Sequence, residues 1–234
     1  MRNLEVSQFT YTPFYCEENV YFLLKKLCKD GIAEADGSDL FIPLWNQKAS
    51  TRADGIILWD YHVICIQRKR GGDSHLVWDL DSSLPFPSPL TSYVSETIRP
   101  SFQLFNEYQS MYDPKMGLED EEKKEIWRLS VLGTEHEQFF RIVHAPIFFR
   151  CFASDRRHMK DSAGNWIAQP PAYEPIVAED ETIHNLNEYM EIHASNELTN
   201  VEGLEADLIN SVFTQQLGVV IRENQLEEFF SQIS

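Results

Sequence analysis

The chain has 234 residues, 43% of them hydrophobic and 12% aromatic, which is enough to bury a full core. Its formal net charge of −17 argues against nucleic acid as a partner, because phosphates would be repelled. The same charge favours a cationic ligand, such as the amino terminus of a peptide. Residues 1–12 lack the regions of a signal peptide, and no apolar run approaches the ~20 residues of a membrane span. We therefore expect one soluble domain, residues 1–234, that is a monomer in the cytoplasm or also the nucleus and binds no membrane.

The cysteines are widely spaced and form no Cys-x-x-Cys pair, so the sequence indicates neither a structural zinc site nor a disulfide framework. They are Cys16, Cys28, Cys65 and Cys151. Cys28 and Cys65 continue apolar patterns and Cys151 follows two phenylalanines and an arginine, so we interpret these three as packing residues. Cys16 differs from them in its position.

The first helix is predicted to begin at or just after Cys16, because apolar residues recur at helical spacing from Val20 to Cys28 and Gly31 supplies a stop. Amides at a helix start are unpaired and carry the positive end of the dipole. They would favour a thiolate at Cys16 and could also donate to an oxyanion. Cys16 is therefore a candidate nucleophile, and the alternative is that it is a small buried hydrophobe.

A predicted hairpin forms the middle of the chain. Residues 40–45 indicate a short extended segment, which Pro43 should confine to a sheet edge or a strand end. Residues 56–66 are apolar on both faces and predict a strand that is covered on each side. Residues 68–73 hold Gly71-Gly72 and predict the turn, after which 75–81 return as the partner strand.

The alternation of the hairpin brings an imidazole and two carboxylates together. With an even-length loop, His62 lies opposite Asp81 and diagonal to Asp79, and a slip by two residues places it opposite Asp79. In either register the three side chains project from the same face of the sheet. An odd-length loop would break this arrangement, since a shift by one residue turns every side chain to the other face.

The rest of the chain alternates short ordered elements with polar segments. We predict helices at 92–98, 208–217 and 226–233, strands at 139–143 and 147–149, and irregular segments at 84–89 and 153–161. We also expect a charged surface excursion at about 106–128 and a mobile acidic insertion at about 178–205.

A thiol at a helix start, a strand histidine and a carboxylate on the neighbouring strand match the needs of thiol acyl transfer. The imidazole takes the thiol proton, the carboxylate fixes its tautomer, and helix-end amides hold the oxyanion. Three alternatives remain: His62 is a hydrogen-bonded core group, the Cys, His and Asp residues bind a metal, or His158 is the base.

Several blocks of the sequence, in order, resemble the protein N-terminal glutamine amidohydrolase family. The most specific block is Trp59-Asp60-Tyr61-His62-Val63. The supporting blocks are Tyr15-Cys16-Glu17-Glu18-Asn19, Ile42-Pro43-Leu44-Trp45, Asp79-Leu80-Asp81 with Leu84-Pro85-Phe86-Pro87, and Phe152-Ala153-Ser154-Asp155-Arg156 through to Gly164-Asn165-Trp166. Together they cover residues 11–173, and the segments at 106–128 and 178–205 are longer than the family pattern suggests.

The resemblance implies a fold, a catalytic set and a reaction. The fold is α+β and papain- or transglutaminase-like, with a mostly antiparallel sheet packed against helices and the nucleophile at the start of the first main helix. The catalytic triad falls on Cys16, His62 and Asp79, so it is the resemblance that selects Asp79 over Asp81. The reaction is hydrolysis of the side-chain amide of an N-terminal glutamine in proteins, through a thioester and with release of ammonia. It feeds the N-degron pathway and uses no metal or organic cofactor.

A site that acts only on terminal glutamine must recognise the substrate's α-ammonium group. A carboxylate would do so, because burying that cation without a partner costs several kcal/mol. Our candidates are Asp155, Glu17 and Glu18, with the rings of Trp45 and Phe152 as pocket walls. For Glu17 and Glu18 the alternative is that they only complement the helix dipole.

Two other classes of function stay open at this point. One is a thiol peptidase or internal-glutamine deamidase on the same fold. The other is a non-catalytic module that binds peptide amino termini, with Cys16 inert.

Overall fold

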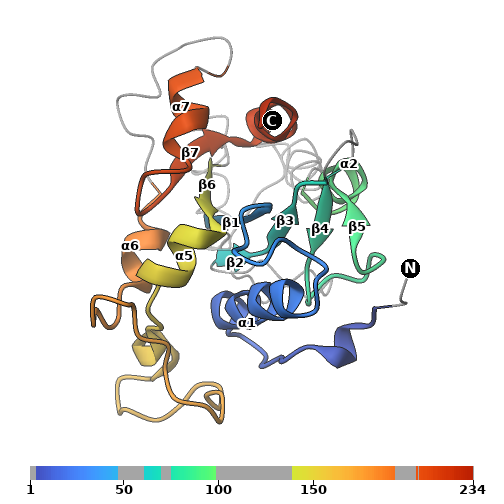
Figure 1. The fold of residues 1–234 in the computed structure, drawn as a ribbon. Helices are drawn as coiled ribbons and strands as arrows, with labels where there is room; N and C mark the ends of the chain where they lie inside the picture. Colours follow the sequence, from blue (N-terminus) through green and yellow to red (C-terminus); the bar gives the residue numbers. More distant parts are fainter. Residues whose placement is uncertain are drawn as a thin grey trace, which may run out of the picture. The chain divides into compact units, whose positions relative to one another are not determined.

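A computed structural model describes residues 4–46, 61–69, 75–98, 139–192, 204 and 206–233. They form helices and an antiparallel sheet, so the fold class is α+β, as predicted (Figure 1). The chain divides into two compact units, residues 1–90 with 138–234, and residues 91–137. Of the second unit, only residues 91–98 are described; they are helical, as predicted.

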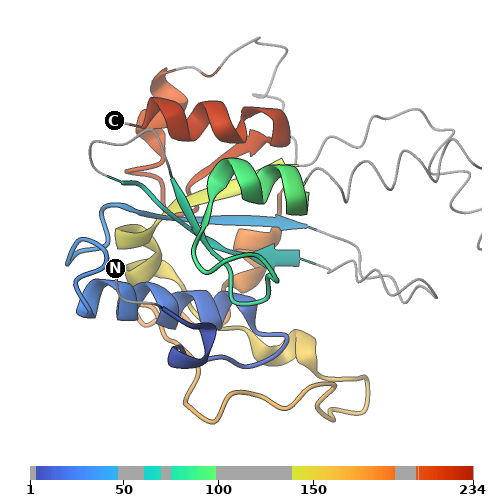
Figure 2. The same ribbon diagram turned by 90° about the vertical axis from the view of Figure 1, so that its right-hand side faces the viewer.

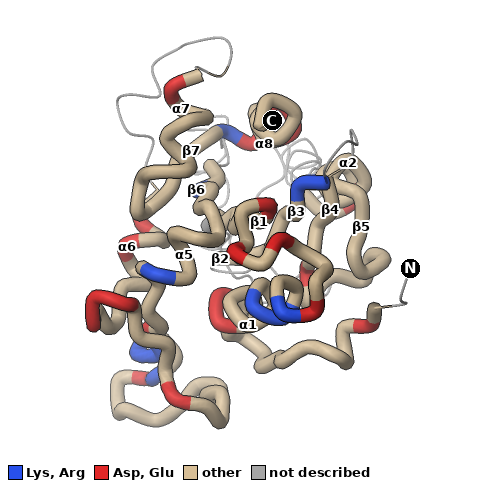
Figure 3. The backbone as a smooth tube through the Cα atoms, in the orientation of Figure 1, with Lys and Arg blue, Asp and Glu red and all other residues tan. Residues whose placement is uncertain are grey.

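Helix α1 spans Cys16–Lys29 and begins at the predicted residue. Acidic side chains occupy its first turn and basic ones its last turn, which complements the helix dipole (Figure 3). The helix ends where Gly31 adopts a φ of 69°, with the amide of Ile32 donating to the carbonyl of Leu27. The predicted helix and its predicted end at Gly31 are therefore both confirmed.

Strand β1, Leu40–Asn46, lies in the interior of the sheet with Pro43 at its middle, so the prediction that Pro43 confines it to a sheet edge or a strand end is wrong. It pairs on one side with β6, Phe139–His144, and on the other with β2, Tyr61–Val63, and β3, Cys65–Gln67. Pro43 lacks an N–H group, but its carbonyl accepts a hydrogen bond from Ile64 at 3.1 Å. Ile64 is also where β2 gives way to β3, so the proline interrupts one ladder without ending the strand.

The sheet of the described residues has seven strands, in the order β5-β4-β3-β1-β6-β7, with β2 paired to β1. The strands not yet given are β4, Leu76–Trp78, β5, Ser88–Pro89, and β7, Val219–Arg222. In the β3–β4 pair, Cys65 faces Trp78 and Ile66 faces Val77, which is the register expected from an even-length loop. Residues 56–60 and 70–74 of the predicted hairpin lie outside the described residues.

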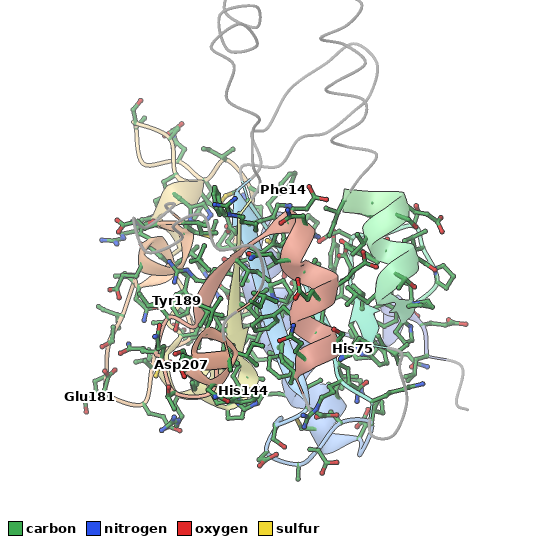
Figure 4. The ribbon with its side chains drawn as sticks, turned by 90° about the horizontal axis from the view of Figure 1, so that it is seen from above. Phe14, His75, His144, Glu181, Tyr189 and Asp207 are labelled. Carbon is green, nitrogen blue, oxygen red and sulfur yellow. The ribbon has the colours of Figure 1, made fainter. Side chains whose placement is uncertain are left out.

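The two faces of the sheet have separate cores. Helix α1 lies on one face and α8, Leu226–Gln232, on the other (Figure 2). On the α1 face, alternate residues of β1 pack with the apolar side of the helix: Leu40, Ile42 and Leu44 with Val20, Leu23, Leu24 and Leu27. On the α8 face, Phe41 contacts Phe230. His75, just before β4, also contacts Phe230, and His144, the last residue of β6, contacts Phe213 (Figure 4).

Two further predictions need correction. Residues 147–149 are not a strand but part of α5, Ala145–Cys151, which Pro146 helps to start. An apolar run of this length cannot distinguish a buried strand from a buried helix. Strand β7 was not predicted at all, although its valines and isoleucine are typical of a strand. The remaining helices are η1 Val6–Gln8, α2 Leu90–Tyr93, η2 Val94–Ile98, η3 Arg156–Met159, α6 Leu186–Met190, α7 Ala206–Ser211 and η4 Glu223–Gln225.

The expected mobile acidic insertion is in part a packed segment. Leu186 and Tyr189 of α6 are buried against the α1-side core. Arg141 of β6 donates to the carbonyls of Tyr189 and Glu191, at 2.8 and 2.9 Å. The prediction of mobility is therefore wrong for residues 178–192. Residues 193–203, like the predicted excursion at 106–128, lie outside the described residues.

No helix in the described part of the chain is both long and apolar enough to cross a bilayer.

Two glycines with the same backbone conformation should differ in how much they contribute to stability. Gly218 has a φ of 64°, and an added Cβ would lie 2.0 Å from the carbonyl oxygen of Ile142. Gly31 has a φ of 69°, and an added Cβ would meet no atom within 4 Å. We expect Gly31→Ala to lower the free energy of unfolding by about 1 kcal/mol and Gly218→Ala by about 3 kcal/mol or more. Urea denaturation measures both, and equal losses would contradict the packing of β6 against the start of β7.

Candidate active site

The start of α1 is held in place by the segment that precedes it. Phe14 adopts a φ of 71°, which turns the chain into the helix just before Cys16. The side-chain amide of Asn19 bonds to both the N–H and the carbonyl of Thr12, each at 2.8 Å. The Tyr15 hydroxyl donates to the carbonyl of Ala168 at 3.2 Å. Cys16 is therefore fixed as the first residue of the helix and is partly exposed.

His62 and Asp79 are in direct contact, as the hairpin register predicts. His62 lies opposite Trp45 in the β1–β2 pair, and the two rings meet edge to face with centroids 5.1 Å apart. The Nε2 atom of His62 is 3.1 Å from Oδ2 of Asp79, which follows β4. The other oxygen of Asp79 accepts a hydrogen bond from the amide of Asp81 at 2.9 Å. Both the ring and the carboxylate are buried, so the imidazole has a fixed orientation.

The surroundings of His62 favour its charged form. Burial lowers the pKa of the imidazole, but the charge of Asp79, its hydrogen bond and the charge of Asp81 outweigh this. The net effect is a raised pKa for His62. The protonated ring must lose its proton before His62 can act as a base, and the raised pKa makes that loss less favourable than from a free imidazole.

The surroundings of the Cys16 thiol favour its neutral form. Burial raises the pKa of the thiol well above its usual value, and the charges of Glu17, Asp81 and Asp79 raise it further. A hydrogen bond from the backbone of Val63 lowers the pKa by less than these effects raise it. The direction of the shift is therefore opposite to the one expected from the start of a helix, because burial comes first and nearby carboxylates add to it.

Glu17 lies beside the thiol and is fully buried. Its Oε2 atom accepts a hydrogen bond from the Tyr61 hydroxyl at 2.7 Å and one from the Cys16 thiol at 3.8 Å. Its Oε1 atom has no hydrogen-bond partner among the described residues. Burial raises the pKa of Glu17 to about 7, although the hydrogen bond from Tyr61 opposes the shift.

The other two candidate carboxylates are already paired with arginines. Arg156 donates to both oxygens of Glu18, at 2.8 and 2.7 Å, in a buried fork. Arg157 donates to both oxygens of Asp155, at 2.8 and 2.6 Å, and lowers the pKa of that carboxyl. Asp155 also accepts from the amide of Arg157 and so caps η3. Glu18 and Asp155 therefore each have an arginine partner within the fold, and the substrate role expected for them stays a prediction.

The two predicted pocket walls lie inside the protein. Phe152 is fully buried and stacks on Phe148, with ring centroids 4.4 Å apart, so it belongs to the core beneath α1. Trp45 is 1% exposed and packs between His62 and Phe140. Trp45 therefore supports the imidazole and Phe152 packs in the core, and the role of either ring as a pocket wall stays a prediction.

Sequence reasoning missed two tyrosines. Tyr61 precedes His62, and strand alternation could have placed its side chain on the α1 face, where it meets Glu17. Tyr11 donates to Asp81 at 2.5 Å, and nothing in the sequence pattern indicated this contact. His158, the competing base, has Nδ1 2.6 Å from the carbonyl of Asp155 and Nε2 3.4 Å from the Tyr61 hydroxyl. Hydrogen bonds therefore hold the His158 ring between the Asp155 carbonyl and the Tyr61 hydroxyl.

A metal ion could also be held near the imidazole. The ligand atoms of His62, Asp79 and Asp81 lie within 4.8 Å of one another. The hydrogen bonds that Asp79 makes to the ring and to the Asp81 amide account for this clustering without an ion. Cys16 does not belong to this set of ligands. A metal bound here would occupy His62 without binding the thiol.

Comparison with known proteins identifies the family. The model of the N-terminal glutamine amidase family matches residues 11–114 and 120–230. The chain belongs to this family. The match includes Cys16, His62 and Asp79, and it agrees with the resemblance that the sequence blocks indicated.

Curated relatives in the N-terminal glutamine amidase family match the chain over most of its length. The chain is 51% identical to a protein N-terminal glutamine amidohydrolase of Arabidopsis thaliana, over 98% of this chain and 95% of the relative. It is 46% identical to one of Oryza sativa subsp. indica, over 98% of this chain and 90% of the relative. It is 31% identical to one of Drosophila melanogaster, over 80% of each chain.

The charge of Asp81 should control the ionisation of the thiol. We expect Asp81→Asn to lower the pKa of the Cys16 thiol and of His62, because the lost negative charge had stabilised the protonated form of each group. The pH dependence of iodoacetamide alkylation at Cys16, followed by mass spectrometry of its peptide, measures the first shift. Asp180→Asn, which removes an exposed charge from a loop, is the matched control and should leave the midpoint unchanged. A midpoint that does not fall in Asp81→Asn would contradict this electrostatic role.

Proposed function

We propose that this chain hydrolyses the side-chain amide of glutamine at the amino terminus of proteins and peptides, giving glutamate and ammonia. The observation that carries the proposal is the contact between His62 and Asp79 in a chain of the N-terminal glutamine amidase family. A helix that starts with Cys16, close enough for Asp79 and Asp81 to act on its thiol, supplies the nucleophile. Both carboxylates also act on the pKa of His62, so the thiol and the ring share the same two charged neighbours.

We assign the fold to the papain- and transglutaminase-like class. The support is the arrangement of three elements: a helix that begins with a cysteine, an antiparallel sheet beneath it, and a histidine on one strand bonded to a carboxylate that follows another. In such an arrangement the nucleophile and its base come from different layers of the fold.

In the first step, neutral His62 accepts the proton of the Cys16 thiol while sulfur attacks the carboxamide carbon. The Nε2 atom faces Asp79, so it carries the hydrogen that the carboxylate accepts, and Nδ1 is the atom that takes the thiol proton. The carbonyl oxygen becomes an oxyanion that the amides at the start of α1, including that of Cys16, stabilise. The high thiol pKa means that proton transfer and attack occur together.

In the second step, the imidazolium returns its proton to the amide nitrogen and the C–N bond breaks. Ammonia leaves, and a thioester between Cys16 and the glutamyl side chain remains. Neutral His62 then takes a proton from water, whose oxygen attacks the thioester carbon. The C–S bond breaks, the sulfur recovers a proton from the ring, and the product is a carboxylic acid. One water is consumed and one ammonia is released per turnover, with no metal in any step.

One assay separates this function from the alternatives. The protein is mixed with a peptide that begins with glutamine, with its acetylated form, and with a peptide that carries glutamine internally. Ammonia release and amide-to-acid conversion in the first peptide alone support the proposal. Chain cleavage would point instead to a peptidase, deamidation of the internal residue to an internal-glutamine deamidase, and binding without turnover to a recognition module.

Replacing the thiol should abolish activity without unfolding the chain. We expect Cys16→Ala to lower kcat by at least about 10⁴-fold, because no other group can form the thioester. Its melting temperature should stay close to that of the original chain, since Cys16 is partly exposed and small. Cys28→Ala changes a cysteine of the same helix and is the matched control, which should keep its activity. Full activity in Cys16→Ala would end the proposal.

A further inference from the structure

Glu17 is a buried carboxylate with an unsatisfied oxygen next to the thiol, and the proposed chemistry does not use it. We infer that Glu17 binds the α-ammonium group of the substrate and thereby restricts the reaction to glutamine at the first position of a chain. This inference rests on the proposed function, because it explains how that reaction would be confined to the amino terminus.

The substrate's cation is what the site has to recognise. A terminal glutamine and an internal glutamine carry the same carboxamide, and they differ in that the terminal residue has a free α-ammonium group. A cation that enters a water-poor site without a partner loses its hydration, so a site with no carboxylate for it would reject the terminal residue. A buried carboxylate reverses this preference, because an internal peptide bond leaves its charge unpaired.

Among the buried carboxylates near the thiol in the described part of the chain, Glu17 is the one whose bonding leaves an oxygen for a ligand. Asp79 bonds to His62 and to the amide of Asp81, and both oxygens of Glu18 bond to Arg156. Asp81 bonds to Tyr11 through one oxygen, but it is exposed, so water can satisfy the other. Glu17 is held at Oε2 by Tyr61, and Oε1 has no partner in the part of the chain that the structure describes. A buried, unpaired carboxylate oxygen is costly for a fold to keep, and a cationic ligand would satisfy it.

The reach of a glutamine side chain fits this position. The α-nitrogen is four bonds from the amide carbon, which places it about 5 Å away when extended and nearer when bent. An attacked carbon sits about 3–3.5 Å from the nucleophile, and Oε2 of Glu17 is 3.8 Å from the Cys16 sulfur. An ammonium group can therefore contact Glu17 while the carboxamide lies against the thiol.

The charge state of Glu17 suits a cation that arrives from water. Burial raises its pKa to about 7, so near neutral pH the carboxyl carries a proton for part of the time. An incoming ammonium can take the place of that proton, and the net charge of the buried site then stays the same. Tyr61 keeps donating to Oε2 throughout, so the carboxyl group stays oriented when the ligand changes.

The test compares two substrates that differ in the amine alone. One is a peptide that begins with glutamine, and the other is the same peptide with hydrogen in place of its α-amino group. We expect Glu17→Gln to raise KM for the amine peptide by about 10- to 100-fold, the usual effect of losing a charge-assisted hydrogen bond. The same variant should leave KM for the desamino peptide unchanged. Glutamine fills the same space and can still accept from Tyr61, so the fold is preserved.

Asp155→Asn is the matched control, because it neutralises a carboxylate that pairs with Arg157. It should leave the preference for the amine peptide unaltered. An equal loss on both peptides in Glu17→Gln, a fall in kcat alone, or no change would each overturn the inference.

Binding of the two peptides to an inactive variant tests the role of Glu17 without any turnover. Calorimetry with Cys16→Ala should show tighter binding of the amine peptide than of the desamino peptide, and adding Glu17→Gln should remove the difference. Failure of the original chain to release ammonia would remove the proposed function. Equal affinity for the two peptides in the Cys16→Ala chain would remove the role of Glu17 whether or not ammonia is released.

Discussion

Packing the first turn of α1 against the sheet buries three carboxylates of the described residues, and the chemistry of the site depends on the hydrogen-bond partner of each. The partners are Arg156 for Glu18, His62 for Asp79 and Tyr61 for Glu17, while Tyr11 bonds to the exposed Asp81 nearby. Burial and the charges of Glu17, Asp81 and Asp79 raise the pKa of the Cys16 thiol, which favours its neutral form. A neutral resting thiol also makes the residue less open to adventitious oxidation than a thiolate would be.

The same carboxylates support catalysis once a substrate is present. Asp79 raises the basicity of His62, which strengthens the ring as an acceptor for the thiol proton. The imidazolium that forms is stabilised by Asp79 and Asp81 at the moment when the oxyanion develops.

Local patterns in the sequence predicted the parts of the fold that local physics decides. The apolar spacing of α1 and the glycine that ends it were sufficient for the helix, and strand alternation was sufficient to place His62 within reach of Asp79 and Asp81, while the family resemblance selected Asp79. Pro43 in a central strand, and the helix 145–151, depend on neighbours that no local pattern reveals. The pKa of the Cys16 thiol and the ion pair of Glu18 with Arg156 depend on groups that are distant in the sequence. Arg157 is close to Asp155 in the sequence, but their ion pair depends on side-chain conformations that no sequence pattern reveals.

The central claim is that the sulfur of Cys16 becomes covalently bound to the substrate, and a direct measurement of that bond tests it best. The chain is mixed with a saturating glutamine-initiated peptide, quenched in acid within milliseconds, digested and analysed by mass spectrometry. We expect the fragment that contains Cys16 to carry the peptide less one ammonia, and the adduct to disappear when the substrate is exhausted. Turnover without this adduct, or an adduct on Cys28, Cys65 or Cys151, would contradict the claim.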